Sequence, residues 1–560
     1  MKKLLHAFLL SIFVISCSSD NGEPNVIDQP TIELDGKQVF RIDVKELSAK
    51  SQAVATQKKL DPAFVLLSIN DASGSAILTR EKIALLQDGD GYITDEITLP
   101  PATYTVVEFI VTDANDVVIS IAPKEDSALA PFTTQPLPFD FVVTSDETKE
   151  TLTENINAAG YTSVDFGYTG LSLTFPESTA SFSLTVDETE SITLKNLNLK
   201  SITGATYLVD WGDGVVEEYV STIVDSGVEN TLSHTYSAND MYTITISGAV
   251  EAIEVFEFNS NQEFDWESHI TSVNFEELTL LKSIGIFTGL LTSLDISKNT
   301  ELEILNVGQH QLTSIDLTNN PNINIITLAD NDLTEINLSQ NPNINHLYLA
   351  RNQIASLDLS QNSSLQVLSA RQNNLSSIDF SNNLNLTQFD LSTNLIDNID
   401  LSLNVDLREI NLGDNNLQTI DLSNNTNLVR VDLYTNQLTT LDVSANLKLR
   451  DLYVENNNLT TLDVTANLDL ERLYIKNNDF SNLDISLNTK MSHLNIGENQ
   501  FNETEIDQIM NLMYDQIVAN AIMDGYFNYL NNPGTSAVSN ATVSKINDLI
   551  VNYSWSFNNG

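Results

Sequence analysis

Large apolar residues recur every 21 positions through the C-terminal half of the chain. The column that starts at Ile270 continues through Leu291, Leu312, Leu333, Ile354, Leu375, Ile396, Leu417, Leu438, Leu459, Phe480 and Phe501. Two asparagine columns keep the same interval, one from Asn331 to Asn499 and one from Asn299 to Asn488. A short repeated unit cannot bury its apolar face alone and must stack on its neighbours. The pattern therefore predicts a solenoid of eleven coils over residues 259–501.

Each repeat has two halves with different signatures. The first half reads Leu312-x-x-Ile315-Asp316-Leu317-Thr318-x-Asn320, and the second half reads Leu347-Tyr348-Leu349-x-x-Asn352. In these patterns the chain resembles leucine-rich-repeat proteins, among them internalin-like adhesins of bacteria. The resemblance implies a β-strand in each second half and a concave face that presents a ligand-binding surface. Buried asparagine amides are expected to satisfy turn backbone groups in their own and neighbouring coils.

The outward positions of the first half-repeat hardly vary. One column holds Asp295, Asp316, Asn337, Asp358, Asp379, Asp400, Asp421, Asp442, Asp463 and Asp484, and the position two residues later is always Ser or Thr. A face that repeats itself carries little information for one specific ligand. We interpret it as a structural ladder in which Asp and Ser/Thr bond to the backbone and to each other. The alternative is a calcium-binding row of carboxylates, because unpaired like charges at strand spacing repel.

The outward positions of the second half-repeat differ from coil to coil. All six arginines of residues 291–500 fall in this strand window, and several tyrosines lie beside them. Tyr and Arg are the residues that dominate interface hot spots. The candidate ligand-binding residues are Tyr348, Arg430, Tyr434, Tyr453, Arg472 and Tyr474. The alternative is a solvated strand face with scattered tyrosines.

The N-terminus has the pattern of a bacterial lipoprotein signal. Lys2 and Lys3 precede an apolar run, residues 4–15, that is too short to span a membrane as a stable helix. Ser16 and Cys17, the single cysteine of the chain, follow the run, and the segment Val14-Ile15-Ser16-Cys17 resembles a lipobox. This implies a signal peptide over residues 1–16 and acylation of Cys17. The acidic tether expected over residues 17–30 resembles that of Bacteroidetes surface lipoproteins; an ordinary secretory signal is the alternative.

Residues 31–174 read as strands, and we expect an antiparallel β-sandwich. The run 103–111 is β-branched and aromatic, and residues 113–116 form a turn before a returning run at 117–121. The segment 88–93 resembles the middle of an EF-hand loop, but Leu86 and Ile97 stand where that loop needs carboxylates. A Gly/Asp hairpin turn is therefore the better interpretation.

Residues 177–258 carry a second resemblance. Asp210-Trp211-Gly212-Asp213-Gly214 is followed by His234-Thr235-Tyr236 and by the strand-like run 242–246. This is similar to the PKD domain, an Ig-like sandwich of extracellular proteins, and implies a spacer module. His234 and Asp213 could form an acid/base pair, but the sequence shows neither a nucleophile nor a pocket to accompany them.

Residues 502–560 leave the 21-residue register. Helical spacing over 506–522 and 543–550, followed by a strand at 553–557, predicts a cap over the last coil. The expected fold is thus mainly β: two β-sandwich modules, a leucine-rich-repeat solenoid and a C-terminal cap.

Composition and charge argue against several classes of function. Lys and Arg number 26 against 76 Asp and Glu, so the net charge is −50, and such a field repels nucleic acid. One cysteine and six histidines leave little material for a metal centre or catalytic triad. The acidic ladders are too regular and exposed for the pKa separation that a hydrolase requires. We therefore expect no enzyme, no cofactor and no bound metal.

By these arguments we expect a monomeric lipoprotein, anchored in the outer membrane and exposed at the cell surface. Its concave repeat face would bind a protein partner, host or microbial, in adhesion. The alternative is a glycan-binding accessory lipoprotein of a polysaccharide-uptake system, because tyrosine faces can stack on sugar rings.

Overall fold

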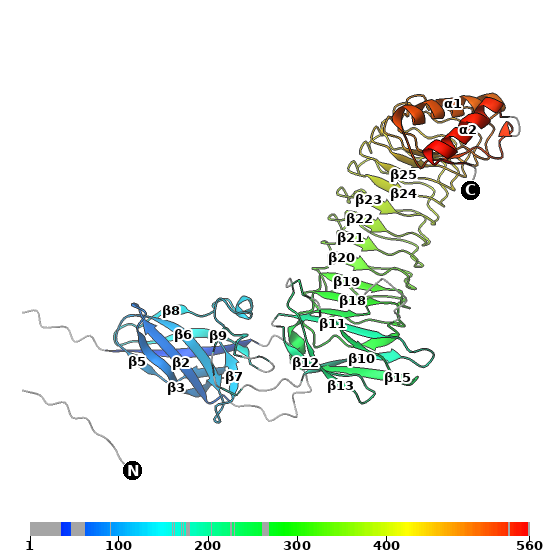
Figure 1. The fold of residues 1–560 in the computed structure, drawn as a ribbon. Coiled ribbons are helices and arrows are strands. Elements are labelled where there is room, and N and C mark those ends of the chain that lie inside the picture. Colours follow the sequence, from blue (N-terminus) through cyan, green and yellow to red (C-terminus); the bar gives the residue numbers. More distant parts are fainter. Residues whose placement is uncertain are drawn as a thin grey trace, which may run out of the picture.

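The structure is a computed structural model (Figure 1). It describes residues 35–557 apart from gaps at 46–61, 90, 159–160, 162, 170, 172, 175–179, 203, 225–226, 229, 260–267 and 536–537. The signal peptide, Cys17 and the tether predicted over residues 17–30 lie outside the described residues. Within the described part, no helix has the length and hydropathy needed to cross a membrane.

The first module is a closed barrel. Its elements are β1 (Gly36–Lys45), β2 (Phe64–Asp71), β3 (Ala76–Asp88), β4 (Gly91–Thr94), β5 (Ile97–Leu99), β6 (Thr103–Thr112), β7 (Val118–Ile121), η2 (Ala130–Phe132), β8 (Phe139–Val142) and β9 (Thr148–Asn157). Seven strands pair in the order β2-β3-β4-β1-β9-β7-β6, and β6 pairs again with β2, which closes the ring. Phe40, Val65 and Phe109 are fully buried in its core.

The sandwich predicted for residues 31–174 is therefore wrong. The physical reason lies in β6, which pairs along one edge with β2 from Tyr104 to Thr112. Its other edge is shared between β8 and β7, so the sheet curls and joins its own first strand. Alternating polarity predicts strands with one buried face, and both a sandwich and a barrel meet that pattern.

Both hairpins predicted in this module are confirmed. β6 and β7 pair antiparallel, with Thr112 opposite Val118. β3 and β4 pair antiparallel, with Asp88 opposite Gly91, so the EF-hand-like segment is a strand-to-strand turn.

The second module contains two sheets that share a core. Its elements are β10 (Ser181–Asp187), β11 (Lys195–Ser201), β12 (Thr206–Asp210), β13 (Val216–Val220), β14 (Leu232–His234), β15 (Met241–Ser247), η3 (Val250–Ala252), β16 (Ile253–Phe258) and β17 (Ile270–Val273). One sheet has the order β13-β12-β15-β10-β17, and the other begins β14-β11-β16. Phe182 on β10 and Phe256 on β16 meet between them, with ring centroids 5.7 Å apart.

The second sheet continues into the solenoid. β16 pairs in parallel with β18 (Ser283–Phe287), with Phe256 opposite Ile284. One buried apolar cluster accordingly runs from Phe182 to Trp555. A separate sandwich over residues 177–258 is therefore not confirmed, since this module shares both a sheet and a core with the first coils.

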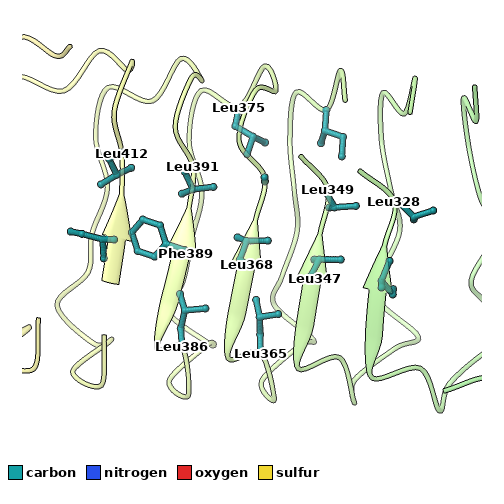
Figure 2. Close-up of a cluster of buried hydrophobic side chains, with 14 of the residues drawn as sticks. Leu328, Leu347, Leu349, Leu365, Leu368, Leu375, Leu386, Phe389, Leu391 and Leu412 are labelled. Atoms are coloured by element: carbon teal, nitrogen blue, oxygen red, sulfur yellow. The ribbon is translucent and has the colours of Figure 1, made fainter. Parts of the chain in front are cut away.

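The solenoid presents one short parallel strand per coil (Figure 1). These are β19 (Ile304–Gly308), β20 (Ile325–Thr327), β21 (His346–Tyr348), β22 (Val367–Ser369), β23 (Gln388–Asp390), β24 (Glu409–Asn411), β25 (Arg430–Asp432), β26 (Asp451–Tyr453), β27 (Arg472–Tyr474) and β28 (His493–Asn495). The central residue of each three-residue strand is buried; Figure 2 shows Leu347, Leu368 and Phe389 in register on neighbouring strands. Their side chains fill the core, and the flanking strand residues face outward.

The cap predicted after the last coil is confirmed. It consists of α1 (Glu503–Asn520), β29 (Tyr526–Asn528), α2 (Asn540–Tyr553) and β30 (Ser556–Phe557). The Asn502 side chain accepts a hydrogen bond from the Glu505 N–H and so caps the start of α1. β29 extends the parallel sheet beyond β28, and β30 follows it. Apolar residues of α1, among them Ile506 and Met513, are buried against the end of the solenoid.

Candidate ligand-binding face

The first asparagine column links each coil to the one before it. The Asn415 side chain accepts a hydrogen bond from the Ile396 N–H at 3.0 Å. Its amide donates to the carbonyls of Leu391, Leu412 and Gly413 at 3.0–3.1 Å. Loops that leave the sheet edge would otherwise have these backbone groups buried and unpaired, so the column fixes the coil geometry.

The second asparagine column makes fewer bonds. The Asn404 amide donates to the carbonyls of Phe380 at 3.2 Å and Asn383 at 3.0 Å. Within the described coils, the side-chain oxygens of nine of its ten members have no hydrogen-bond partner. The two columns are both buried, but the first is the more fully bonded.

The repetitive half-coil forms a ladder of local turns. The Asp358 side chain accepts a hydrogen bond from the Ser360 N–H at 2.9 Å, and the same contact recurs along the column. These bonds hold the pKa of Asp358 below its ordinary value. Across the described residues, no three His, Cys, Asp or Glu side chains are grouped so that they could hold a metal ion. The aspartate side chains form hydrogen bonds within their own turns, as the structural-ladder interpretation expects.

The variable half-coil carries a continuous stack of side chains. The guanidinium carbon of Arg430 lies 4.9 Å from the centre of the Tyr453 ring. The rings of Tyr453 and Tyr474 follow with centroids 5.0 Å apart, and Tyr474 and Tyr526 are stacked at 6.3 Å. We call Arg430, Tyr453, Tyr474 and Tyr526 the ring stack. It crosses from β25 to β29, and every member is at least partly exposed.

The two arginines of this region are already paired within the chain. Arg430 bonds Asp432 at 2.8 Å, and Arg472 bonds Asp451 at 2.9 Å. Both arginine side chains remain about half exposed, at 45% and 41%. These pairs hold the guanidinium groups in place, and their positive charge is largely balanced before any ligand arrives.

The other two tyrosine candidates lie outside the stack. Tyr434 leans toward the preceding coil, where Gly413 leaves room for it: a Cβ at that glycine would lie 2.3 Å from the ring. Tyr348 sits on β21, four strands before β25, which is roughly 19 Å at 4.8 Å per strand. Four of the six predicted residues are thus brought together, Tyr434 is adjacent, and Tyr348 is separate.

Two residues of the site were not selected from the sequence. Tyr526 belongs to the cap and lies 33 residues after His493, its partner on β28, so the 21-residue register does not locate it. Glu455 follows Tyr453 on the outward face, and one of its carboxylate oxygens is buried with no hydrogen-bond partner in the described structure. Burial raises the pKa of Glu455 to about 7. In the sequence, the only feature that singles out Glu455 is its place in an outward column whose residues differ from coil to coil.

Burial also affects the tyrosine hydroxyls. Burial, followed by the neighbouring Tyr453 and Tyr526, raises the pKa of Tyr474 to about 12. Burial likewise raises the pKa of Tyr453. The stack therefore presents neutral hydroxyls that can both donate and accept hydrogen bonds at physiological pH.

No protein-family model and no curated protein matches the sequence. Among solved structures, an internalin (inlF) from Listeria monocytogenes is similar over 54% of this chain and 87% of its own, with 19% identity and a TM-score of 0.47. The functional domain of InlJ from the same organism is 23% identical over 53% of this chain and 71% of its own, with a TM-score of 0.39. A leucine-rich-repeat protein of Leptospira interrogans is 21% identical over 50% and 85%, with a TM-score of 0.41.

These similarities are partial, and the repeats of the chain itself define its architecture. Parallel strands 21 residues apart, a buried apolar residue at the centre of each strand and an asparagine that bonds the preceding coil recur from β20 to β28. Residues 283–501 therefore form a leucine-rich-repeat solenoid.

Proposed function

We propose that this protein is a non-catalytic binding and adhesion protein that captures a protein partner on the outward strand face of its repeats. The observation that carries the proposal is the ring stack, which three strands of the solenoid and strand β29 of the cap assemble through contacts within the chain. Large, half-exposed aromatic and arginine side chains held in one geometry lose little conformational freedom on binding.

Packing within the stack distinguishes it from scattered surface tyrosines. Aromatic pairs at such distances contribute about 0.5–1.5 kcal/mol beyond their buried area, and Arg430 adds a cation–π contact. A purely solvated face has no need of these contacts. The opposite, repetitive half-coil uses its polar side chains within its own turns, so fewer groups there remain for a ligand.

Glycan capture is the second candidate, and the row of tyrosines is the observation that favours it. Sugar recognition by stacking needs a free ring face. Arg430 and Tyr474 flank Tyr453, while Tyr453 and Tyr526 flank Tyr474, so these rings offer mainly edges and hydroxyls. That presentation suits the mixed apolar and polar contacts of a protein surface better.

The proposal includes an anchor and spacers. Cys17 would carry the lipid that holds the chain at the outer membrane, with residues 17–30 as a tether. The module at 31–174 and the PKD-like module at 177–258 would hold the solenoid away from the membrane as a monomer exposed at the surface. The lipobox-like sequence and the acidic segment after it support this arrangement.

Arrays of proteins and glycans test the binding class. The labelled full chain would be applied beside a Tyr453→Ala/Tyr474→Ala variant and a control, Asp358→Ala/Asp379→Ala, on the repetitive face. We expect protein spots that retain the wild type and the control but not the tyrosine variant. Tyrosine-dependent glycan spots would favour the second candidate, and binding that needs only the aspartates would refute both.

A further inference from the structure

We infer that the partner presents a cationic side chain, Lys or Arg, which docks beside the ring stack against Glu455. This inference rests on the proposed function and names the chemistry of the partner. It is drawn from one incompletely satisfied carboxylate and from the distribution of charge over the surrounding strands.

Glu455 lies in the outward column between Tyr434 and Lys476. One of its oxygens is buried and makes no hydrogen bond within the described structure, and burial raises the pKa of the carboxyl to about 7. The neighbouring cation is engaged elsewhere, because Lys476 bonds Glu498 at 3.3 Å. A desolvated carboxylate oxygen without a hydrogen bond is unfavourable, and an incoming ammonium or guanidinium would add favourable charge beside it.

The outward positions around Glu455 carry more acidic than basic side chains, which also favours a cationic partner. The outward positions from β23 to β28 include five carboxylates and three cations: Asp390, Glu409, Asp432, Asp451, Glu455, Arg430, Arg472 and Lys476. Each cation is paired with an acid of the chain. Among the described residues, Asp390, Glu409 and Glu455 have no ion-pair partner, against one such cation, Arg408 directly before β24, so the unpaired charge of this face is negative on balance.

The tyrosines add to this preference. Their ring faces are taken up by contacts within the stack, but their neutral hydroxyl oxygens can accept hydrogen bonds from an ammonium or guanidinium group. The net charge of −50 would also draw a basic surface toward the solenoid and repel an acidic one. A basic protein segment is therefore the partner that fits.

A random twelve-residue peptide library displayed on phage provides a defined probe. It would be selected on the full-length protein and counter-selected on the Tyr453→Ala/Tyr474→Ala variant. One enriched peptide would then be synthesised and titrated against wild type, Glu455→Gln and Glu335→Gln. Glu335 is an exposed carboxylate of another half-coil and serves as the matched control. Thermal melts would verify that each variant is folded.

We expect the tyrosine-dependent peptides to be rich in Lys and Arg. Glu455→Gln should weaken binding tenfold or more, and Glu335→Gln less than twofold. Tyrosine-dependent peptides that lack basic residues, or that bind Glu455→Gln as tightly as wild type, would overturn the inference and leave the proposed face intact. A selection with no tyrosine-dependent peptide would count against both.

Discussion

Arg430 and Tyr453 meet across two adjacent coils, with the guanidinium carbon 4.9 Å from the centre of the ring. Asp432, two residues later on the same strand, accepts a hydrogen bond from the same guanidinium at 2.8 Å, and its side chain is only 5% exposed. The arginine is therefore held by a buried acid on its own strand and a ring on the next. Because Tyr453 also touches Tyr474, it couples β25 to β27.

Replacing Tyr453 with alanine should accordingly remove more than one contact. For a partner found on the arrays, we expect Tyr453→Ala to cost about 2 kcal/mol, or about thirtyfold in Kd. Isothermal titration would measure it. Asp358→Ala/Asp379→Ala should change Kd little, since exposed single charges usually contribute little. If the aspartate variant alone loses binding, calcium-bridged adhesion through the ladder would replace the proposed function.

The asparagine columns give a prediction about stability. Asn415→Ala deletes the acceptor of the Ile396 N–H and the donor to three carbonyls, all buried, and should cost about 1–3 kcal/mol. Tyr453→Ala should cost less, because water can replace contacts at a half-exposed site. Asn404→Ala is the internal comparison and should fall below Asn415→Ala, since its amide makes two bonds. Denaturant unfolding would rank them; a neutral Asn415→Ala would contradict the argument.

Gly413 and Tyr434 should be energetically coupled. A Cβ at Gly413 would lie 2.3 Å from the Tyr434 ring, so Gly413→Ala forces the ring to move and should destabilise by about 1–3 kcal/mol. In a Tyr434→Ala background the space is empty. There the same change should be neutral or stabilising by about 0.4–1 kcal/mol, because alanine reduces the freedom of the unfolded chain. Equal effects in the two backgrounds, measured as a double-mutant cycle, would mean that the ring does not rest on the glycine.

The anchor can be tested independently of the binding face. Cys17→Ser should abolish incorporation of labelled lipid and move the protein from the membrane fraction to the soluble fraction. Several acyl chains anchor stably because each buried methylene contributes about 0.8 kcal/mol, and serine offers no thiol for the first of them. Lipid labelling that survives Cys17→Ser would show that the lipid is attached at another residue.

Periodicity explains why the repeats could be predicted and the barrel could not. Stacking at a fixed interval leaves one arrangement for the leucines and asparagines, so Leu347 and Asn352 could be placed from the sequence alone. Closure of the barrel depends on which strand pairs with the free edge of β6, a long-range choice that alternating polarity does not encode. Tyr526 was missed for a similar reason, because it reaches the site from the cap.

The site also shows the limit of reading residue types. Tyr and Arg at variable positions pointed to the strands that carry most of the ring stack. The sequence could not show that Arg430 and Arg472 are paired with Asp432 and Asp451 two and twenty-one residues away. Because Arg430 and Arg472 are already paired, they contribute little preference for an acidic partner. The Glu455 carboxyl, which has no ion pair among the described residues, favours a basic partner instead.

His310 occupies the position where the next coils have an asparagine of the first column, 21 residues before Asn331. One ring nitrogen lies 3.4 Å from the Leu291 N–H and the other 3.3 Å from the Ile286 carbonyl, which repeats the bonding of Asn331. Gly289 makes room for the larger ring, since a Cβ there would lie 2.6 Å from it. At the start of the solenoid, the His310 imidazole therefore makes the hydrogen bonds that an asparagine amide makes in the following coils.

This replacement predicts a pH-dependent weakness. Burial lowers the pKa of His310 to about 4, below the ordinary 6.5, so the unfolded chain takes up the proton first as pH falls. The stability it contributes is complete above pH 6.5 and is lost between pH 6.5 and 4, by about 3 kcal/mol at most.

His310→Asn keeps the hydrogen bonds with a group that does not titrate. Its unfolding free energy should therefore decline less than that of wild type over this interval, whatever its value at pH 8. Other titrating groups are common to both proteins, so the difference between the two curves isolates His310. Parallel curves from denaturant titrations at pH 8, 6 and 4.5 would show that His310 has the same pKa in the folded protein as in the unfolded chain, which would contradict the argument.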